Sequence, residues 1–340
     1  MKESNLAIRT GFTTIDEMTG GLKKGELVCI ASRPGLGKTA LALNIVANVV
    51  LAKESKPVLF ISLEMNRFAI MQRLVAAEAK VGVTGIRTGF FRRDRWQDIT
   101  TAVARFAEAP LVINNASGNA AMSIRDTWYV FIDIVERLAH HKPKSIAARS
   151  GEPPLPSKGN SALTVLNLRA RSLEVRRRLR QDGKELGLIV VDPVQLLQDA
   201  SQVEPRKEEH SEISRDLKGL ACELDIPIIA VSRLSRLVGP KVRTDTHPQM
   251  SDLREFGAFG ENADLVLFVH RECPRPGSAA AIQEAVNLIP QWDDAKIFAA
   301  KPPIPEYDDA EIVVAKNPRG KAGTVKMKFE REYVTFSEIS

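Results

Sequence analysis

One stretch near the N-terminus, ELVCIASRPGLGKTALALNI, limits the fold more than any other part of this sequence. An apolar run, Leu27–Ala31, enters a loop that carries Gly35 and Gly37, and a helical pattern then runs from Thr39 to about Lys53. A strand, a glycine-rich loop and a helix in this order gather backbone N–H groups and a helix N-terminus around one point, which is a geometry that binds phosphates. The sequence therefore predicts an α/β fold with a nucleotide site at the end of this strand.

The predicted nucleotide-binding residues are those of the loop itself: Ser32, Arg33, Pro34, Gly35, Leu36, Gly37, Lys38 and Thr39. Gly35 and Gly37 allow close approach of the backbone, Lys38 meets the β- and γ-phosphates, and the Thr39 hydroxyl ligates Mg²⁺. Ser32 stands where this pattern usually has glycine, and a small residue still fits there. We therefore expect ATP and Mg²⁺ as ligands, and the alternative is a loop that binds nucleotide without hydrolysing it.

Five further apolar runs of strand length are separated by longer segments: Val58–Leu63, Leu111–Asn114, Leu186–Val191, Pro227–Val231 and Leu265–Val269. Hydrophobic strands that alternate with helices are typical of a parallel sheet buried on both faces. One helix is indicated by the apolar stripe of Ile213, Leu217, Leu220 and Leu224. The C-terminal segments GTVKMKF and YVTFSE instead alternate like an antiparallel hairpin. We therefore predict a mainly parallel central sheet flanked by helices, with a C-terminal antiparallel hairpin at its edge.

The chain has 340 residues, which is enough for one large α/β domain or two small ones. We predict a single domain over residues 1–340, with insertions at roughly 117–160 and 274–309. The first insertion contains GEPPLPSKGN and the second contains PRPGS and KPPIPEYDD, and such segments are typical of loops. Both are therefore interpreted as additions to one compact core.

Composition and patterning exclude several classes of protein. No apolar run approaches the ~18 residues of a membrane span, and the opening MKESNLAIRTG has no apolar stretch of a signal peptide. Cys29, Cys222 and Cys273 lie far apart, without the spacing of a disulfide framework or a zinc site. We therefore expect a cytoplasmic protein with no membrane partner.

The net charge of +6 is concentrated between Arg125 and Glu185, where basic residues outnumber acidic ones. Such an excess is typical of contact with phosphates, and the alternative is the solvated face of a helix. A basic helix is predicted over Ser161–Arg180, and Leu168 and Val175 fall near the face that a sheet would cover. A helix docked on the sheet is therefore the favoured interpretation, and contact with DNA is the lesser one.

Two carboxylates follow predicted strands and suit the chemistry of hydrolysis. LGLIVVD places Asp192 at the end of a buried strand, where it holds Mg²⁺ directly or through water. VLFISLEM places Glu64 at the end of another strand, where a carboxylate beside the γ-phosphate orients and deprotonates water. The alternatives are a plain strand-ending aspartate and a glutamate that begins a helix.

Seven segments together resemble the C-terminal ATPase domain of DnaB-type replicative helicases. In the family's motif order they are TGFTTIDEMTGGLKKGEL, ASRPGLGKTALALNI, ISLEM, LGLIVVDPVQLL, SEISRDLKGLACELDIPIIAVS, SDLREFGAFGENADLVLFVHR and AKNPRGKAGTV. The resemblance covers nearly the whole chain apart from the two insertions. It implies a RecA-like P-loop NTPase fold and a hexameric ring that hydrolyses ATP at subunit interfaces. It also implies 5′–3′ helicase movement along single-stranded DNA during DNA replication.

The resemblance assigns roles to single residues. Lys38 and Thr39 bind phosphate and Mg²⁺, Asp192 is the Walker B carboxylate, and Glu64 is the catalytic base. SDLREFG matches the loop that faces DNA, and a charged loop suits single strands because phosphate contacts dominate their affinity. The implied DNA-binding residues are Arg254, Glu255 and Gly257.

The chain departs from the family pattern in ways that bear on catalysis. Arg233, in SRLSR, stands where the family has a glutamine that senses the γ-phosphate. In KNPRGKAG, Lys316 keeps its place, Pro318 takes that of the arginine finger, and Arg319 comes one place later. We include Arg233, Lys316 and Arg319 among the catalytic residues, because a long side chain tolerates a small register shift. The family's N-terminal domain and linker helix precede the matching region, and we expect this chain to lack both.

Three functions remain open at this point. The first is an ATP-driven helicase or translocase on single-stranded DNA, working as a homo-oligomer. The second is a DNA-stimulated ATPase accessory in loading, recombination or defence, without unwinding. The third is a KaiC- or RadA-like ATPase that acts on protein partners, since those proteins share the RecA core. SDLREFGAFGENAD favours the first two, because it is similar to the helicase DNA loop.

Overall fold

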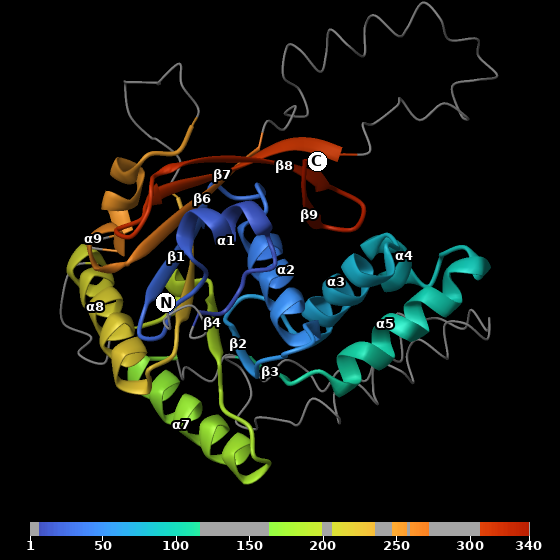
Figure 1. Cartoon of the computed structure of the whole chain (residues 1–340), viewed down its shortest axis with the longest axis horizontal. Helices are drawn as coiled ribbons and strands as arrows, with labels where there is room; N and C mark the ends of the chain where they lie inside the picture. The colour runs from blue at the N-terminus through green and yellow to red at the C-terminus, as the bar shows by residue number, and fades with distance from the viewer. Residues whose placement is uncertain are drawn as a thin grey trace, which may run out of the picture.

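A computed structural model describes residues 7–115, 163–198, 206–234, 247–256, 259–271 and 307–339. The predicted insertion at 117–160 lies outside these residues, and so does the one at 274–309 as far as residue 306. The described residues form one continuous sheet with helices on both of its faces (Figure 1).

The sheet has the strand order β3-β2-β4-β5-β1-β6-β7-β8-β9 among the described residues. The strands are β1 Leu27–Ser32, β2 Val58–Ser62, β3 Leu111–Asn115, β4 Leu188–Asp192, β5 Ile228–Arg233, β6 Leu265–Arg271, β7 Tyr307–Lys316, β8 Gly323–Glu330 and β9 Thr335–Glu338. Pairing is parallel from β3 to β6 and antiparallel from β6 to β9. This confirms the predicted fold class, with a mainly parallel sheet and a C-terminal antiparallel hairpin.

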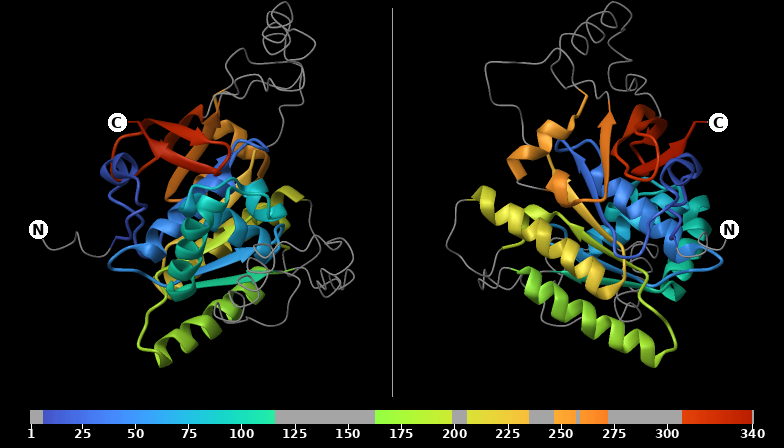
Figure 2. Two further views of the ribbon diagram at one scale, coloured as in Figure 1. Left: turned by 90° about the vertical axis from the view of Figure 1, so that its right-hand side faces the viewer. Right: turned by 60° about the vertical axis from the view of Figure 1, so that its left-hand side comes forward.

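Helices cover the sheet in two layers (Figure 2). They are α1 Thr13–Thr19, α2 Lys38–Leu51, α3 Arg67–Ala79, α4 Val83–Thr88, α5 Trp96–Glu108, α7 Val165–Gln181, α8 Arg206–Leu224 and α9 Phe259–Asn262, with 3₁₀ turns at Arg93–Arg95, Val194–Leu196 and Met250–Phe256. One hydrophobic core joins α2, α3 and α5 to the sheet, and a second joins α7 and α8 to its other face. The predicted stripe on α8, from Ile213 to Leu224, is buried in the second core.

Strand β7 is not among the strands that the sequence predicts. It alternates between buried and exposed residues, so it lacks the continuous apolar run that marks the parallel strands. Asp308, Ala310, Ile312 and Val314 face the interior. The strand also follows the proline-rich KPPIPE, and for that reason its first residues resemble a loop in the sequence.

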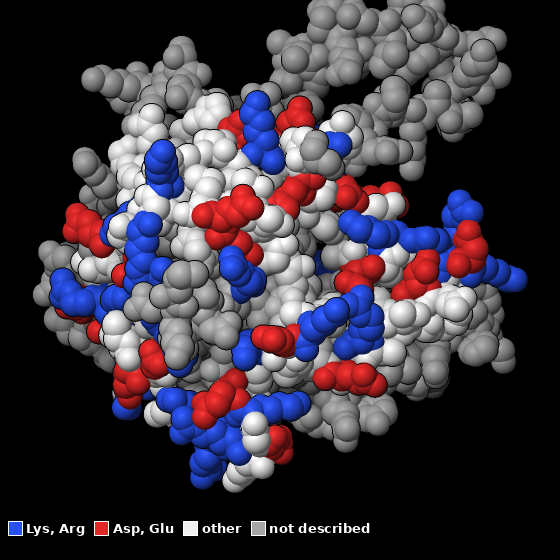
Figure 3. Space-filling view, viewed as in Figure 1, with Lys and Arg blue, Asp and Glu red and all other residues white. Residues whose placement is uncertain are grey.

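Helix α7 docks on the sheet through Val165, Leu168, Ser172 and Val175 and turns a basic face outward. Lysine and arginine side chains gather over its position at the lower edge of the molecule (Figure 3). Several are paired with acids, as the 2.6 Å contact between Arg169 and a Glu223 carboxylate oxygen illustrates. This agrees with the favoured interpretation of a docked helix with a solvated face. Over the described residues, no helix combines the length and apolar character that crossing a membrane requires.

Candidate active site

The polar residues singled out in the sequence meet at one edge of the sheet. Strands β2, β4, β5 and β1 lie side by side and run parallel, so their carboxyl ends share an edge. The register pairs Ser62 with Asp192 and Ser32 with Arg233. Ligands of open parallel sheets bind outside the carboxyl ends of the strands. The fold therefore gathers Glu64, Asp192, Arg233 and the glycine-rich loop around one place.

The loop after β1 has the backbone that its glycines allow. Gly35 has a φ of 84° and Gly37 a φ of 106°, both in the left-handed region that side chains with a Cβ rarely adopt. Gly37 also precedes the first residue of α2, and a Cβ there would lie 2.9 Å from the Phe336 ring. Ser32 is buried and its hydroxyl donates to the Arg33 carbonyl at 2.8 Å. Serine in place of glycine is thus accommodated by an internal hydrogen bond.

Lys38 begins α2 and is buried beneath the loop, at 9% exposure. Burial is the largest influence on its ammonium group and lowers its pKa, while the charge of Asp192 acts in the opposite direction. Arg233 and Arg73 lower the pKa further, because they are like charges nearby. A buried cation at a helix N-terminus is a strong binding element for an anion.

Asp192 ends β4 and faces Thr39. Burial raises its pKa, whereas a hydrogen bond with the Thr39 side chain and the charge of Lys38 oppose that rise. Its Oδ1 atom is buried and has no hydrogen-bond partner among the described residues. Such an orphaned acceptor is costly unless a cation or water meets it. A carboxylate oxygen beside a hydroxyl therefore fits Mg²⁺.

The protein alone does not complete a metal site. No group of three or more His, Cys, Asp or Glu side chains within the described ranges is arranged to hold a metal ion. Mg²⁺ commonly takes one or two protein oxygens and fills its remaining positions with water and substrate phosphates. Asp192 and Thr39 suit that mode of binding.

Glu64 lies between β2 and α3 and forms an ion pair with Arg233. The turn that carries it is fixed by Ser62, whose hydroxyl accepts from the Met65 N–H at 3.0 Å and donates to the Met65 carbonyl at 2.7 Å. Arg233 ends β5, and the Gln195 amide supports this end by donating to Ser232 Oγ at 2.7 Å. The predicted base and the predicted sensor therefore contact each other across the end of β4, and both remain about half exposed.

Arg73 is a site residue that the sequence reasoning missed. It lies on α3, and burial lowers the pKa of its guanidinium while the charges of Asp192 and Glu64 raise it. A signal was available, because Arg73 stands beside the buried Leu74 and one turn after the buried Ile70, on a helix that directly follows ISLEM. An arginine in that apolar stripe needs a counter-charge. The site thus places three cations, Lys38, Arg73 and Arg233, around two carboxylates.

Lys316 and Arg319 are both engaged within the chain. Lys316 donates to the carbonyls of Gly260 at 3.1 Å, Glu261 at 2.7 Å and Ala263 at 2.6 Å, at the C-terminal end of α9. All three donors of its ammonium group are therefore used. Arg319 forms an ion pair with the buried carboxylate of Glu26 and is itself about half exposed. Neither side chain contacts Lys38 or Asp192 through any of these bonds.

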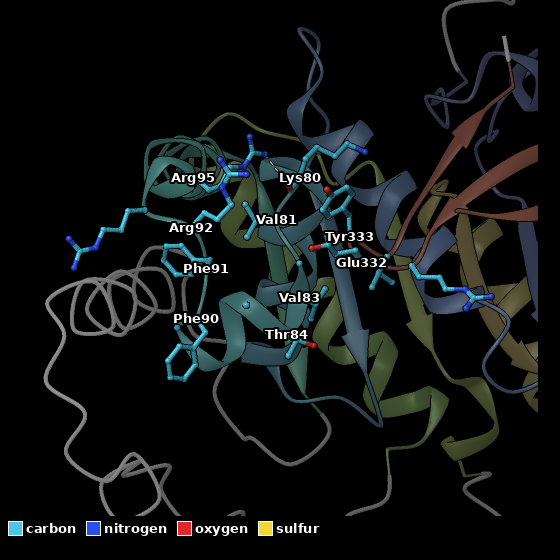
Figure 4. A pocket seen from close by; sticks show the side chains of 16 residues that line it. Lys80, Val81, Val83, Thr84, Phe90, Phe91, Arg92, Arg95, Glu332 and Tyr333 are labelled. Atoms are coloured by element: carbon cyan, nitrogen blue, oxygen red, sulfur yellow. Dashed lines mark hydrogen bonds between the residues drawn. The ribbon is translucent and has the colours of Figure 1, made fainter. Parts of the chain in front are cut away.

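The predicted DNA-binding residues belong to the 3₁₀ turn Met250–Phe256 and the residue after it. The backbone of Arg254 and Glu255 lies in that turn, but their side chains are outside the description, as is Gly257. A separate hollow of about 1050 Å³ opens between the start of α4 and the turn after β8 (Figure 4). Phe90, Phe91 and Tyr333 line it together with Lys80 and Arg92, and none of the predicted site residues does.

Comparisons with known proteins identify the family of this chain. A sequence model of the family described as DnaB-like helicase C terminal domain matches residues 7–132 and 136–338. The replicative DNA helicase DnaB of Leifsonia xyli subsp. xyli is 33% identical over 82% of this chain and 51% of its own length. That of Geobacillus stearothermophilus is 35% identical over 78% of this chain and 47% of its own length. The chain thus spans about half the length of the curated relatives it matches.

Solved structures give the same result. The solved ATPase domain of another protein superposes with a TM-score of 0.70 at 25% identity, covering 100% of this chain and 94% of that one. A DnaB-like replicative helicase, solved in a study of its interactions with primase, gives a TM-score of 0.69 at 26% identity, covering 98% of this chain and 62% of that one. The predicted RecA-like fold is confirmed, and the chain belongs to the DnaB-like helicase C-terminal domain family.

Proposed function

We propose that this chain binds and hydrolyses ATP with Mg²⁺ as the motor of a DNA helicase. The observation that carries the proposal is that buried Lys38 lies close enough to Asp192 to feel its charge, while Asp192 Oδ1 has no hydrogen-bond partner among the described residues. The loop from Ser32 to Thr39 binds the phosphates, with Lys38 at the β- and γ-phosphates. Thr39 and Asp192 hold Mg²⁺, which neutralises the charge that develops on the phosphate oxygens.

Glu64 serves as the general base that orients and deprotonates the attacking water. In the free protein its carboxylate pairs with Arg233, so the pair must open before Glu64 can accept a proton. The γ-phosphate supplies a competing anion for Arg233, because guanidinium groups bind phosphate in two-pronged fashion. Arg233 is thereby drawn to the nucleotide and releases Glu64, and substrate binding frees the base.

The DNA-binding role is proposed from the relatives, which are replicative DNA helicases. Single-stranded DNA passes the loop that holds Arg254, Glu255 and Gly257, and ATP turnover drives the helicase along the strand in the 5′–3′ direction. The chain works as a homo-oligomer, a hexameric ring with its ATP sites between subunits. Arg319 reaches the site of the neighbouring subunit after leaving Glu26. Lys316 anchors the end of β7, and so the segment that carries Arg319, to the end of α9.

DNA-stimulated hydrolysis by an oligomer tests this function. A site completed by its neighbour is nearly silent in a monomer, so the rate per chain should rise with protein concentration and with added single-stranded DNA. DNA binding should weaken steeply with salt, because phosphate contacts release counterions. Arg254→Ala should reduce the stimulation and leave the basal rate close to that of the parent. A rate independent of concentration and of DNA at low salt would contradict the proposal and favour an ATPase that acts on proteins.

A further inference from the structure

The glycine-rich loop is supported by an arginine of the neighbouring strand β6. Its tip is open, since Pro34 and Gly35 are exposed and a Cβ built on Gly35 would meet nothing within 4 Å. The carbonyl oxygen of Gly35 nevertheless accepts a hydrogen bond of 2.8 Å from Nη2 of Arg271. Arg271 ends β6, the neighbour of β1, and the register that pairs Ala31 with Phe268 brings the end of β6 alongside the loop.

Arg271 is itself buried, between a carboxylate and an aromatic ring. Its side chain is 7% exposed, and Nη1 lies 3.3 Å from Oδ2 of Asp308, whose side chain is 2% exposed. The guanidinium carbon lies 4.1 Å from the centre of the Phe329 ring, and Asp308 pairs with Phe329 across β7 and β8. A buried arginine is tolerated only when it is paired and well bonded. Within the described residues Nε and Nη1 make no hydrogen bond, so the charge of Asp308 and the face of the Phe329 ring hold the guanidinium group, and Nη2 makes the bond to Gly35.

Fixing the Gly35 carbonyl also fixes the N–H of the next residue. A peptide unit is planar and trans, so its C=O and N–H point in opposite directions. With the carbonyl drawn toward Arg271, the Leu36 N–H points to the interior of the loop, where it makes a long 3.4 Å contact with the Arg33 carbonyl. Such a weak internal contact is easily exchanged for a phosphate oxygen.

We propose that Arg271 is a positioning residue that holds the phosphate-binding loop in its binding conformation through the Gly35 carbonyl. The inference rests on the proposed ATPase function and adds a residue that acts through the loop. The free loop would otherwise have to order itself as each nucleotide binds, and that cost would weaken affinity. Arg271 therefore contributes to phosphate affinity and contributes little to the rate at saturation.

The experiment compares Arg271→Gln with Arg331→Gln. Arg331 donates to the same Asp308 carboxylate at 2.7 Å, so its loss disturbs the network without removing the bond to Gly35. Binding is measured by calorimetry with MgATP and, separately, with magnesium and inorganic tripolyphosphate. We expect Arg271→Gln to raise Kd for both ligands by about 10-fold, and Arg331→Gln to change it by less than about 2-fold. KM for ATP should rise with Kd in Arg271→Gln while kcat stays within about 2-fold.

Arg271→Lys completes the series, because it keeps the charge and loses the two-pronged geometry, and its Kd should lie between those of the parent and the glutamine variant. If Arg271→Gln does not fold, the lysine variant carries the test, and a tripolyphosphate Kd equal to the parent's overturns the inference. Loss of affinity for ATP alone would also overturn it, since the contact would then concern the nucleoside. An equal loss in Arg331→Gln would assign the effect to general stability. A parent that binds neither ligand would instead refute the proposed function.

Discussion

Two regions differ in how their charged side chains are paired: the sheet edge that carries the candidate active site, called the site edge below, and the end of β7. At the site edge, Asp192 has a buried oxygen with no hydrogen-bond partner among the described residues, and burial lowers the pKa of Lys38. At the end of β7, Lys316 donates to three carbonyls and Arg319 pairs with Glu26. The first region is electrostatically incomplete within one chain, whereas the second is satisfied.

The difference indicates what each region is built to receive. Orphaned buried charges lower stability, so a fold that keeps them is poised for a ligand that completes them. Satisfied cations stabilise the free chain, and any role for them in a neighbouring subunit requires that they first leave their partners. If the proposed function holds, the candidate nucleotide site is prepared for its ligand, whereas Lys316 and Arg319 must break contacts before they can act in a neighbouring subunit.

Replacing Lys38 with alanine should have the largest effect. The substitution removes the buried cation that meets the phosphates, and ATP hydrolysis should fall to the background of the assay. The fold should survive, because Lys38 lies at the junction of loop and helix. Burial lowers the pKa of Lys38, so burying its charged form costs free energy in the folded protein. Steady-state ATPase assays and thermal unfolding measure the two quantities. Parent-like hydrolysis in this variant would show that the site is elsewhere.

Glu64→Gln should reduce turnover by ~10²-fold or more, because the amide keeps the shape of the side chain and cannot accept the proton. Nucleotide binding should persist, since the loop and Lys38 are unchanged. Single-turnover hydrolysis and equilibrium binding of ATP separate these effects. Turnover equal to that of the parent would exclude Glu64 as the base.

Arg319→Ala tests whether Arg319 acts in the site of a neighbouring subunit. We expect the rate at high protein concentration to fall by about 10-fold, less than a well-placed arginine finger supplies, because Pro318 shifts Arg319 by one place. The rate of the dilute monomer should not change. Glu26→Gln is the matched control, since it breaks the same ion pair and leaves Arg319 available. If both variants behave alike at every concentration, Arg319 serves only its own chain.

Arg233→Gln should lower the ATPase rate by a few-fold, roughly the loss of one charge-assisted phosphate contact. The substitution also frees Glu64 from its ion pair, which opposes the loss and keeps the net change small. Initial rates across ATP concentrations measure the outcome. A rate above that of the parent would show that Arg233 restrains the base more than it assists the phosphate.

Asp192→Asn should have the smallest effect on the free protein, and its sign is informative. Burial raises the pKa of Asp192 above its ordinary 3.8. The parent therefore loses stability as pH rises from that ordinary pKa to the raised pKa of the folded state, and it stays less stable at neutral pH. The asparagine variant avoids this loss and should melt higher at pH 7 by roughly 2 °C without Mg²⁺ or nucleotide. The difference should vanish in acid, and the Mg²⁺ dependence of nucleotide binding should be weakened. A lower melting temperature at pH 7 would mean that the attraction between Asp192 and the buried Lys38 outweighs the cost of burying the carboxylate.

The parallel strands and the position of the loop were predictable, because each depends on a local pattern: continuous apolar runs, two glycines and a lysine before a helix. Strand β7 was missed, since its alternation resembles an exposed edge and it follows a proline-rich segment. The roles of Arg73 and Arg271 were not predictable in the same way. Each depends on a partner distant in sequence, as the bond from Arg271 to Gly35 illustrates. The ion pair between Glu64 and Arg233 required knowing that β2 and β5 flank β4.

The glycine-rich loop and the helix after it are held by residues that come much later in the sequence, and this has a consequence for how the protein is made. The Asn44 side chain accepts a hydrogen bond of 2.9 Å from the Phe336 N–H, and these residues are 292 positions apart. At the usual synthesis rate of ~5–20 residues per second, roughly 15–60 s separate their emergence from the ribosome. A nascent chain therefore exposes the glycine-rich loop long before β6 to β9 exist to hold it. Under the proposed function, ATP meets the complete loop support only after these strands have been synthesised.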